Sequence, residues 1–413
     1  MKAQTTFRVA SLQAALAAVF VAFLGCALAS SSTGAERADL GKKKAEVNKI
    51  LAEGQAPNEL FEEYFKKDFL PLFSDPGRGY SIDDLPKLRR ELRYFFMRAK
   101  RGEAYDLLHK MVLEKMIGTV ISKARFKSHD AAIRYNAMLV ISDLNELDDA
   151  GKPKPSGPAL TFLISAIKST SVKDYLRTGV LIGLERQAAA GAIPKDKADE
   201  LTTLLLKLVA QQDPPAGRDP AAHQYLRLRA AQVLAAMGRP GPNNSVVKAL
   251  AEVAADPKAR PTLRCEMAQF MGQFKYGKTP EAEVQQLVNC LGHQTVDICK
   301  HELDSVRIAN RPPSRRMIVY SLTSVMAGLG GDSRTGLQAA AAGTPTQKSI
   351  ATLYAKLKQI SLELENPDDG TKSDSLDDAV ALEVTGKLNE VERTLGAVAA
   401  AKKPDLMAAE KKK

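Results

Sequence analysis

The segment QYLRLRAAQVLAAMG (Gln224–Gly238) carries the pattern that decides the fold of this chain. Arg227 stands three residues before Ala230 and seven before Leu234, which is the spacing of one face of a helix. Four other segments share this phase: AAIRYNAMLVISDL (Ala131–Leu144), KDYLRTGVLIGLER (Lys173–Arg186), PTLRCEMAQFMGQF (Pro261–Phe274) and SRRMIVYSLTSVMAGLG (Ser314–Gly330). The sequence therefore predicts five helices in which an arginine keeps the same register with an apolar stripe.

The arginines recur at intervals of similar length. They are Arg134, Arg177, Arg227, Arg264 and Arg315, separated by 43, 50, 37 and 51 residues. Each arginine helix after the first follows another apolar helix across a polar loop, at Ala159–Ile167, Leu201–Val209, Val246–Val253 and Val284–Leu291. The loops include Pro153-Lys154-Pro155, Asp213-Pro214-Pro215 and Pro240-Gly241-Pro242. This predicts a repeating unit of helix, turn and helix, about 40 residues or more in length.

The recurrence resembles the HEAT-repeat family over roughly residues 100 to 330. The resemblance implies an all-α fold, an α-solenoid of antiparallel helix pairs whose second helices line a concave side. It also implies that the arginine at the start of each second helix pairs with acids or carbonyl groups of the neighbouring unit. The spacing is less regular than in the family, and Gly179 follows Arg177 where a larger residue would pack better.

The five arginines admit a second interpretation, as an anion-binding groove. We expect the packing role to prevail because this position usually belongs to the contact between repeats. Burial separates the two, since guanidinium groups exposed on one face would favour binding.

The composition supports a helical class and gives the chain a positive charge. Ala, Leu, Lys, Glu and Gln dominate, while strand-like runs of Val, Ile and Thr are scarce. The formal net charge is +11. A basic chain can favour an acidic partner, a polyanion or an anionic surface, although a charge spread along the sequence also serves solubility.

The N-terminus has the features of a secretory signal peptide. Lys2 and Arg8 precede an uncharged apolar run that ends in Ala27-Leu28-Ala29. We expect a signal at residues 1–29 with cleavage after Ala29, and a bacterial periplasmic or envelope location. Two alternatives are lipidation of Cys26, in a loose lipobox, and retention of the run as an anchor. We expect no transmembrane segment in the mature chain.

Residues 30–58 and 59–115 are predicted to be a polar linker with a short helix and an N-terminal helical cap. In the cap, Phe61, Phe65, Phe69 and Phe73 recur at helical spacing, and Leu85, Leu88, Leu92, Phe95 and Phe96 form a second stripe. The second stripe's helix also carries Lys87, Arg89, Arg90, Arg93, Arg98, Lys100 and Arg101. Because its aromatics share the Leu stripe, we expect them in the core, and we expect no nucleic-acid partner.

The HEAT-like repeats are expected to occupy residues 116–330, and the pattern loosens after them. We expect a linker at residues 331–346, helices within residues 347–400 and a disordered basic tail at residues 401–413. Leu376, Val380, Val384, Leu388, Val391 and Leu395 form the seam of the last helix. The seam could pair with the preceding helix as a hairpin or present a coiled-coil face to a partner. The acidic turn around Gly370 does not fit a calcium loop, because Leu376 falls where an acidic ligand is needed.

Three cysteines remain after removal of the predicted signal. Cys290 is expected to end one helix and Cys299 to begin the next, so we predict a disulfide between them. A bridge that uses Cys265, three reduced thiols, or pairing with another chain are the alternatives. The cluster of Cys290, His293, Cys299 and His301 is a weak metal motif, and we expect no metal there.

The sequence contains no G-x-S-x-G, P-loop, dinucleotide-binding glycine motif or H-E-x-x-H. We therefore predict a protein that is not an enzyme and needs no cofactor. The expected function is a protein-binding scaffold of the periplasm or envelope, which uses the concave face or the last helix to bind a protein of unknown identity. The alternative is a basic protein that binds an envelope polyanion or surface.

Overall fold

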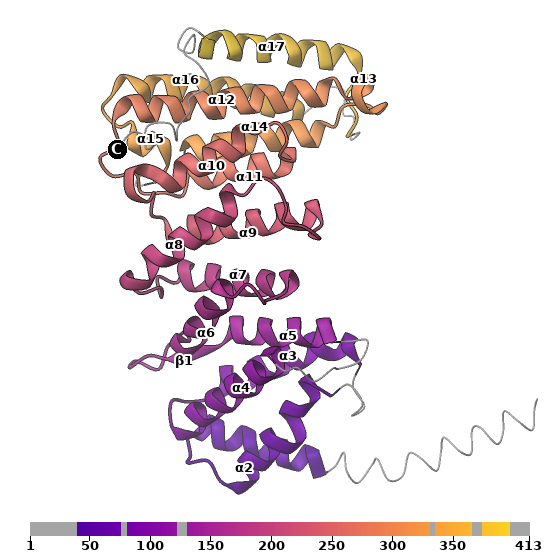
Figure 1. Cartoon of the computed structure of the whole chain (residues 1–413), viewed down its shortest axis with the longest axis vertical. Coiled ribbons are helices and arrows are strands. Elements are labelled where there is room, and N and C mark those ends of the chain that lie inside the picture. Colours follow the sequence, from indigo (N-terminus) through magenta and orange to yellow (C-terminus); the bar gives the residue numbers. More distant parts are fainter. Residues whose placement is uncertain (1–38, 76–80, 122–129, 331–334, 366–373, 397–413) are drawn as a thin grey trace, which may run out of the picture. The chain divides into compact units, whose positions relative to one another are not determined.

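The computed structural model describes residues 39–75, 81–121, 130–330, 335–365 and 374–396, and these are almost entirely α-helical (Figure 1). The chain divides into two compact units, residues 1–154 and 155–413. The boundary lies within the range expected for the repeats, not at residue 116. The predicted signal, Cys26, the acidic turn around Gly370 and the basic tail lie outside the described residues.

Unit 1 begins with a helix at residues 39–53, inside the segment predicted to be a polar linker. A short helix was expected here, but not its place in the core: Val47, Ile50 and Leu51 are at most 1% exposed. Their spacing of three and one places them on one helix face, and the lysines lie on the others. The polar composition of the segment gave no sign that this helix belongs to the core.

The four phenylalanines of the expected cap are buried, but their segment is not one regular helix. It consists of α2 (Glu59–Glu63), the π-helix η1 (Tyr64–Phe69) and the 3₁₀-helix η2 (Leu70–Phe73). In an α-helix a strict spacing of four residues drifts around the axis by about 40° per step. The wider π-helical turn takes up this drift, so Phe61, Phe65 and Phe69 stay in edge contact.

The rest of unit 1 is formed by α3 (Leu85–Arg98), α4 (Glu103–Ile121), α5 (Asp130–Asp143) and a two-stranded sheet at the end of the unit. A 3₁₀ turn, η3 (Ile82–Asp84), precedes α3. The strands β1 (Asn145–Leu147) and β2 (Pro153–Pro155) stand where a plain loop was expected. The Asp148 carboxylate closes their turn by accepting hydrogen bonds from the backbone N–H groups of Ala150 and Lys152.

Unit 2 contains four of the five helices predicted from the arginine register, together with the helices that precede them, while the fifth, around Arg134, is α5 of unit 1. Those in unit 2 are α6 (Gly157–Lys168), α7 (Asp174–Ala189), α8 (Lys195–Ala210), α9 (Pro220–Met237), α10 (Ser245–Ala255), α11 (Pro261–Met271), α12 (Glu281–Leu303) and α14 (Arg315–Gly330). Shorter pieces are η5 (Pro242–Asn244), α13 (Ser305–Ala309) and α15 (Gly336–Ala340). Helix starts follow ordinary capping rules: the Ser156 and Asp219 side chains accept hydrogen bonds from the N–H groups of Ala159 and Ala222.

Most helices in unit 2 pack against helices one to three places away in the sequence. One series runs α7, α9, α11 and α14, with each helix in contact with the next. A second series runs α8, α10 and α12, and α6, α8 and α10 also pack against α7, α9 and α11. Figure 1 shows α7, α9 and α11 following one another in this part of the chain.

Two glycines allow α11 and α14 to meet backbone to backbone. A Cβ atom on Gly328 of α14 would lie 2.2 Å from the Ala268 carbonyl oxygen of α11. One on Gly272, directly after α11, would lie 2.1 Å from the Ala327 carbonyl oxygen. Contacts this short do not occur in proteins, so the crossing requires a residue without a side chain on each partner.

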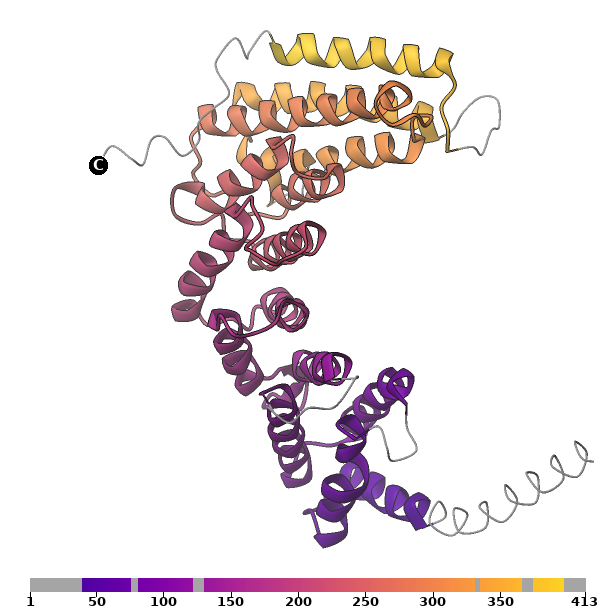
Figure 2. The same ribbon diagram turned by 45° about the vertical axis from the view of Figure 1, so that its right-hand side comes forward.

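Unit 2 ends with α16 (Pro345–Glu365) and α17 (Asp378–Gly396). The α17 residues of the predicted seam are buried from Val384 to Leu395, with Val380 half-buried, and Leu376 just before the helix is buried as well. Helix α17 packs against α12 and α16, and both views show the yellow α17 alongside the orange α12 (Figure 1 and Figure 2). The seam therefore lies inside the unit. The linker expected at 331–346 includes α15, whose Leu337 is buried.

Candidate functional site

Four of the five predicted arginines perform the same local task. Each donates a guanidinium hydrogen to a carbonyl oxygen at the C-terminal end of the helix before it. The donor is Nε in three cases, Arg134 to Val120 at 2.8 Å, Arg227 to Val209 at 2.9 Å and Arg264 to Ala254 at 2.8 Å. In Arg177 it is Nη2, which donates to Ser169, the C-cap of α6, at 2.9 Å, while Nε donates to Val172 in the following loop at 3.1 Å. The last carbonyl groups of a helix have no partner within it and carry the negative end of its dipole. A guanidinium group at this point satisfies a carbonyl and offsets the dipole.

The carbonyl groups belong to the first helix of the same pair. The resemblance to HEAT repeats had implied a partner in the neighbouring unit instead. Arg264 adds such a neighbour, because its Nη2 also lies 2.8 Å from an oxygen of Asp297 on α12. Arg315 departs from the series. Its backbone N–H donates to the Asp374 carbonyl oxygen at 2.7 Å.

Burial decides between the packing and anion-binding interpretations of these arginines. Arg227 is 2% exposed and Arg264 is 5% exposed, while Arg134, Arg177 and Arg315 are half-buried. Burial lowers the pKa of the Arg177 and Arg227 guanidinium groups from the ordinary value. Side chains that are enclosed and already bonded to carbonyl groups are poor candidates for an anion-binding groove.

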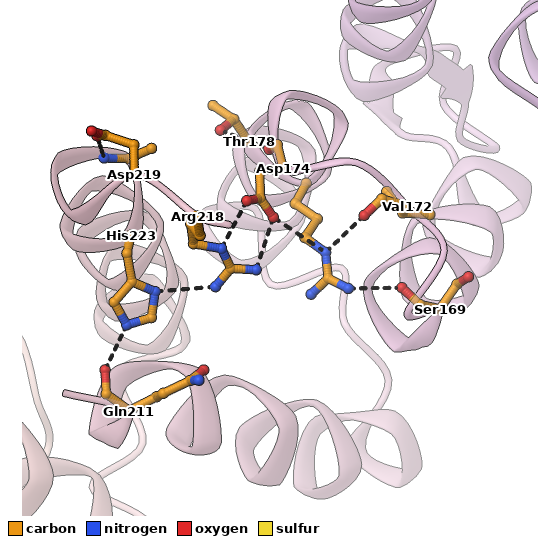
Figure 3. A network of polar contacts seen from close by, with 10 residues as sticks. Ser169, Val172, Asp174, Thr178, Gln211, Arg218, Asp219 and His223 are labelled. Carbon is orange, nitrogen blue, oxygen red and sulfur yellow. Dashed lines mark hydrogen bonds and ion pairs between the residues drawn. The ribbon is translucent and has the colours of Figure 1, made fainter. Parts of the chain in front are cut away.

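A polar network that the sequence did not reveal lies beside Arg177, at the start of α7 and α9 (Figure 3). Arg218, in the loop before α9, forms a two-fold contact with Asp174, from Nε at 2.7 Å and from Nη2 at 2.8 Å. Its Nη1 lies 3.1 Å from Nδ1 of the buried His223, and His223 Nε2 lies 2.8 Å from the Gln211 carbonyl oxygen. An arginine can only donate, so Nδ1 accepts and Nε2 carries the hydrogen that Gln211 accepts. This geometry holds His223 neutral.

His223 should make the stability of unit 2 depend on pH. Desolvation, and the positive charges of Arg218 and Arg227, lower the pKa of His223 from 6.5. Its contribution is complete above the unfolded-state pKa of about 6.5 and is lost as pH falls toward the lower folded-state value. We expect urea unfolding to show lower stability at pH 5.5 than at pH 7.5, roughly in proportion to this shift.

The matched variant is His223→Gln, which removes the titrating ring. Its stability should change less between pH 7.5 and pH 5.5. Burial also lowers the pKa of His109, but His109 is present in both chains and contributes equally to each. Equal pH dependence in the two chains would show that protonation of His223 is not what destabilises the fold.

The predicted Cys290–Cys299 disulfide is wrong. Both residues lie in the continuous helix α12, where nine residues advance the axis by about 13 Å, beyond the reach of a disulfide. Cys265, Cys290 and Cys299 are all free. Burial raises the pKa of the Cys265 and Cys290 thiols to about 11 and that of Cys299 to about 12, which disfavours thiolate chemistry.

The Cys/His cluster does not converge either. His293 is exposed on α12, whereas Cys299 is buried. Among the residues that the structure describes, no three His, Cys, Asp or Glu side chains are grouped to hold a metal ion. A cavity of about 300 Å³ near the ends of α7 and α9 is lined largely by Ala188, Ile193, Ala198 and Met237, with Lys195 and Arg239 beside them. Its lining contains no acid, histidine, cysteine, serine or threonine.

Two exposed surfaces remain as candidate sites. The first is the unburied side of α7, α9, α11 and α14, which we call the second-helix face. It includes Tyr175, Ile182, Glu185, Tyr225, Arg229, Glu266 and Tyr320. Contacts join adjacent helices across it: Arg229 pairs with Glu185 at 2.7 Å, and the Tyr320 hydroxyl donates to Glu266 at 2.5 Å. Tyr225 is 47% exposed.

The second surface is the outer face of α3. Of the two phenylalanines of α3 that were expected in the core, Phe95 is buried and Phe96 is half-buried. Tyr94 was overlooked: it is exposed together with Met97, and Arg98 lies 4.8 Å from the centre of its ring. The basic side of this helix therefore contains apolar groups.

No helix among the described residues combines the length and apolar character needed to span a bilayer. Comparison with known proteins gives no relative to guide the assignment: no family model, no curated protein and no solved structure matches this chain.

Proposed function

We propose that this protein is a non-enzymatic scaffold of the HEAT-like α-solenoid kind, exported to the cell envelope, that binds a protein through its second-helix face. Two observations support the solenoid. Each helix of unit 2 packs against helices that are near it in the sequence, and in four helix pairs an arginine of the second helix caps the C-terminal end of the first. Repeat proteins of this kind commonly bind partners on the surface formed by successive helices.

The observation that carries the proposal is the composition of the second-helix face. Partly exposed tyrosines on α7, α9 and α14 stand among bonded charged pairs. Tyrosine and arginine are enriched at the centres of protein interfaces, because they combine a large apolar area with a polar group. The last helix is a weaker choice for the binding site than its seam suggested, since that seam is buried against α12 and α16.

Replacing both Tyr175 and Tyr225 by Ser should weaken binding of the partner strongly. Loss of two interface tyrosines corresponds to a decrease in affinity of about 30-fold or more. The test is affinity capture from envelope extract with the full chain, identification by mass spectrometry, and measurement of the dissociation constant with the purified partner.

Leu382→Ser is the matched control, because Leu382 is an exposed apolar residue on α17, far along the chain. If the tyrosine variant binds the partner as tightly as the unchanged chain does, the second-helix face is not the binding site. If binding is lost only with Leu382→Ser, the exposed side of α17 is the interface.

A second candidate function is binding to an anionic envelope surface, and a specific observation favours it. Residues 85–101 contain seven basic residues and a single acid, Glu91, which is paired with Lys44 at 2.5 Å. Binding of this kind should weaken steeply with ionic strength, whereas binding through an apolar interface should change little.

A further inference from the structure

The outer face of α3 combines positive charge with exposed apolar groups in a single stripe. Arg90, Tyr94, Met97 and Arg98 follow one another at helical spacing and all are exposed, Met97 to 77%. The opposite side of the helix is held in the core by Leu88, Leu92 and Phe95. Packing of the opposite side therefore holds these four side chains on the outer surface of the unit.

Charged partners neutralise only part of this face. Arg93 pairs with Asp143 at 2.8 Å and Arg101 with Asp149 at 3.1 Å. Within the described part of the chain, Arg90 and Arg98 have no acid at ion-pair distance. Arg98 is held instead over the Tyr94 ring, an arrangement that leaves the full charge of its guanidinium group available.

An anionic bilayer fits both properties of the stripe. Anionic headgroups attract basic side chains, and just below them lies an interfacial layer in which tyrosine is favoured and a methionine side chain is sheltered from water. A helix surface is convex, so it meets a broad surface more readily than it encloses a peptide. Nucleic acid fits less well. Proteins that bind single strands stack successive bases on several aromatic rings, whereas this face exposes the ring of Tyr94 alone.

We propose that the outer face of α3 docks the protein on anionic phospholipid bilayers, with Arg90 and Arg98 at the headgroup phosphates and with Tyr94 and Met97 in the interfacial layer. The inference rests on the second candidate function and locates it on a surface. It is independent of the second-helix face, so one chain could bind both a bilayer and a protein partner.

The test is flotation of the full chain with vesicles of equal parts phosphatidylcholine and phosphatidylglycerol, and with vesicles of phosphatidylcholine alone. The measured quantity is the ratio of the two affinities, because the apolar N-terminal run would contribute to both. Each basic residue near an anionic surface changes affinity by about fivefold, so Arg90→Glu with Arg98→Glu should reduce the ratio by about 25-fold or more. Tyr94→Ser with Met97→Ser should weaken binding to the mixed vesicles by about tenfold.

Lys42→Glu with Lys49→Glu is the matched control, since it makes the same charge change on exposed residues of the helix at 39–53. Circular dichroism melting must give the same transition for every variant compared. A ratio reduced equally by the control and the α3 charge variant would overturn the assignment to α3 and leave surface binding in place.

An unchanged chain that shows no preference for the mixed vesicles would overturn both this inference and the second candidate function. Binding to heparin or single-stranded DNA that depends on Arg90 and Arg98, without binding to vesicles, would overturn the bilayer in favour of a polyanion.

Discussion

Replacing Gly328 by Ala is expected to destabilise unit 2 by about 3 kcal/mol, because the new methyl group has no space. It would lie 2.2 Å from the Ala268 carbonyl oxygen, an atom of the α11 backbone that cannot rotate away. The two helices would have to separate by about 1 Å, and their remaining contacts would then lose a quarter to a half of their dispersion energy. Urea unfolding followed by circular dichroism gives the loss directly.

Gly386→Ala provides a control of opposite sign. Gly386 lies within α17, and a Cβ atom there would meet nothing within 4 Å. Alanine is the better helix former, so this variant should gain about 0.5 to 1 kcal/mol. If both alanine variants were to gain stability, the close crossing of α11 and α14 would be disproved.

Replacing Arg227 by Ala should cost about 4 kcal/mol, the largest effect that we expect from any of the predicted arginines. The side chain is 2% exposed, so its removal leaves a cavity, and the Val209 carbonyl oxygen loses its donor. Arg227→Met should cost less than half as much. Methionine fills most of the volume, and it also removes the buried Nη2, which has no hydrogen-bond partner among the described residues.

Arg316→Ala is the matched control, since the Arg316 side chain is 86% exposed and should contribute about 0.5 kcal/mol or less. Thermal and urea unfolding of the three variants would distinguish the roles of shape and charge. Equal losses in the Ala and Met variants would mean that the hydrogen bond to Val209 outweighs the packing.

The arginine register predicted the positions of the helices well, because each arginine keeps a constant spacing from the apolar residues of the same helix. The predicted segments around Arg177, Arg227 and Arg264 coincide with α7, α9 and α11 to within a few residues at most ends. The sequence could not tell which carbonyl groups each arginine would meet, because that depends on where the preceding helix ends in space.

The break expected between Cys290 and Cys299 failed for an identifiable reason. Gly292, which lies between the two cysteines in the middle of α12, gives space to the Leu395 side chain of α17, whose methyl groups would lie 2.6 Å from a Cβ atom there. A glycine can mark a close approach as readily as a turn. Only the position of a helix about 100 residues further along the chain distinguishes the two.

The network around Arg218 and the α3 face were missed for different reasons. Arg218 lies in a loop without periodicity, and its partner Asp174 is 44 residues away. On α3, Phe95 and Phe96 drew attention to the core stripe, although Tyr94 falls one position earlier, on the basic side. One residue corresponds to about 100° of rotation, which is enough to move a ring from the core to the surface.

The packing of helices against sequence neighbours in unit 2 has a consequence for how the chain acquires its structure. Contacts between helices that are close in sequence close short loops, so they form quickly and one after another. A chain that emerges gradually through a membrane pore, as we expect for an exported protein, can fold each helix pair as it appears. Helix α17 is the exception, because Glu392 reaches back 92 residues to Lys300. The part of α12 that α17 covers then stays exposed until α17 has emerged, and we expect a chaperone to matter most at this stage.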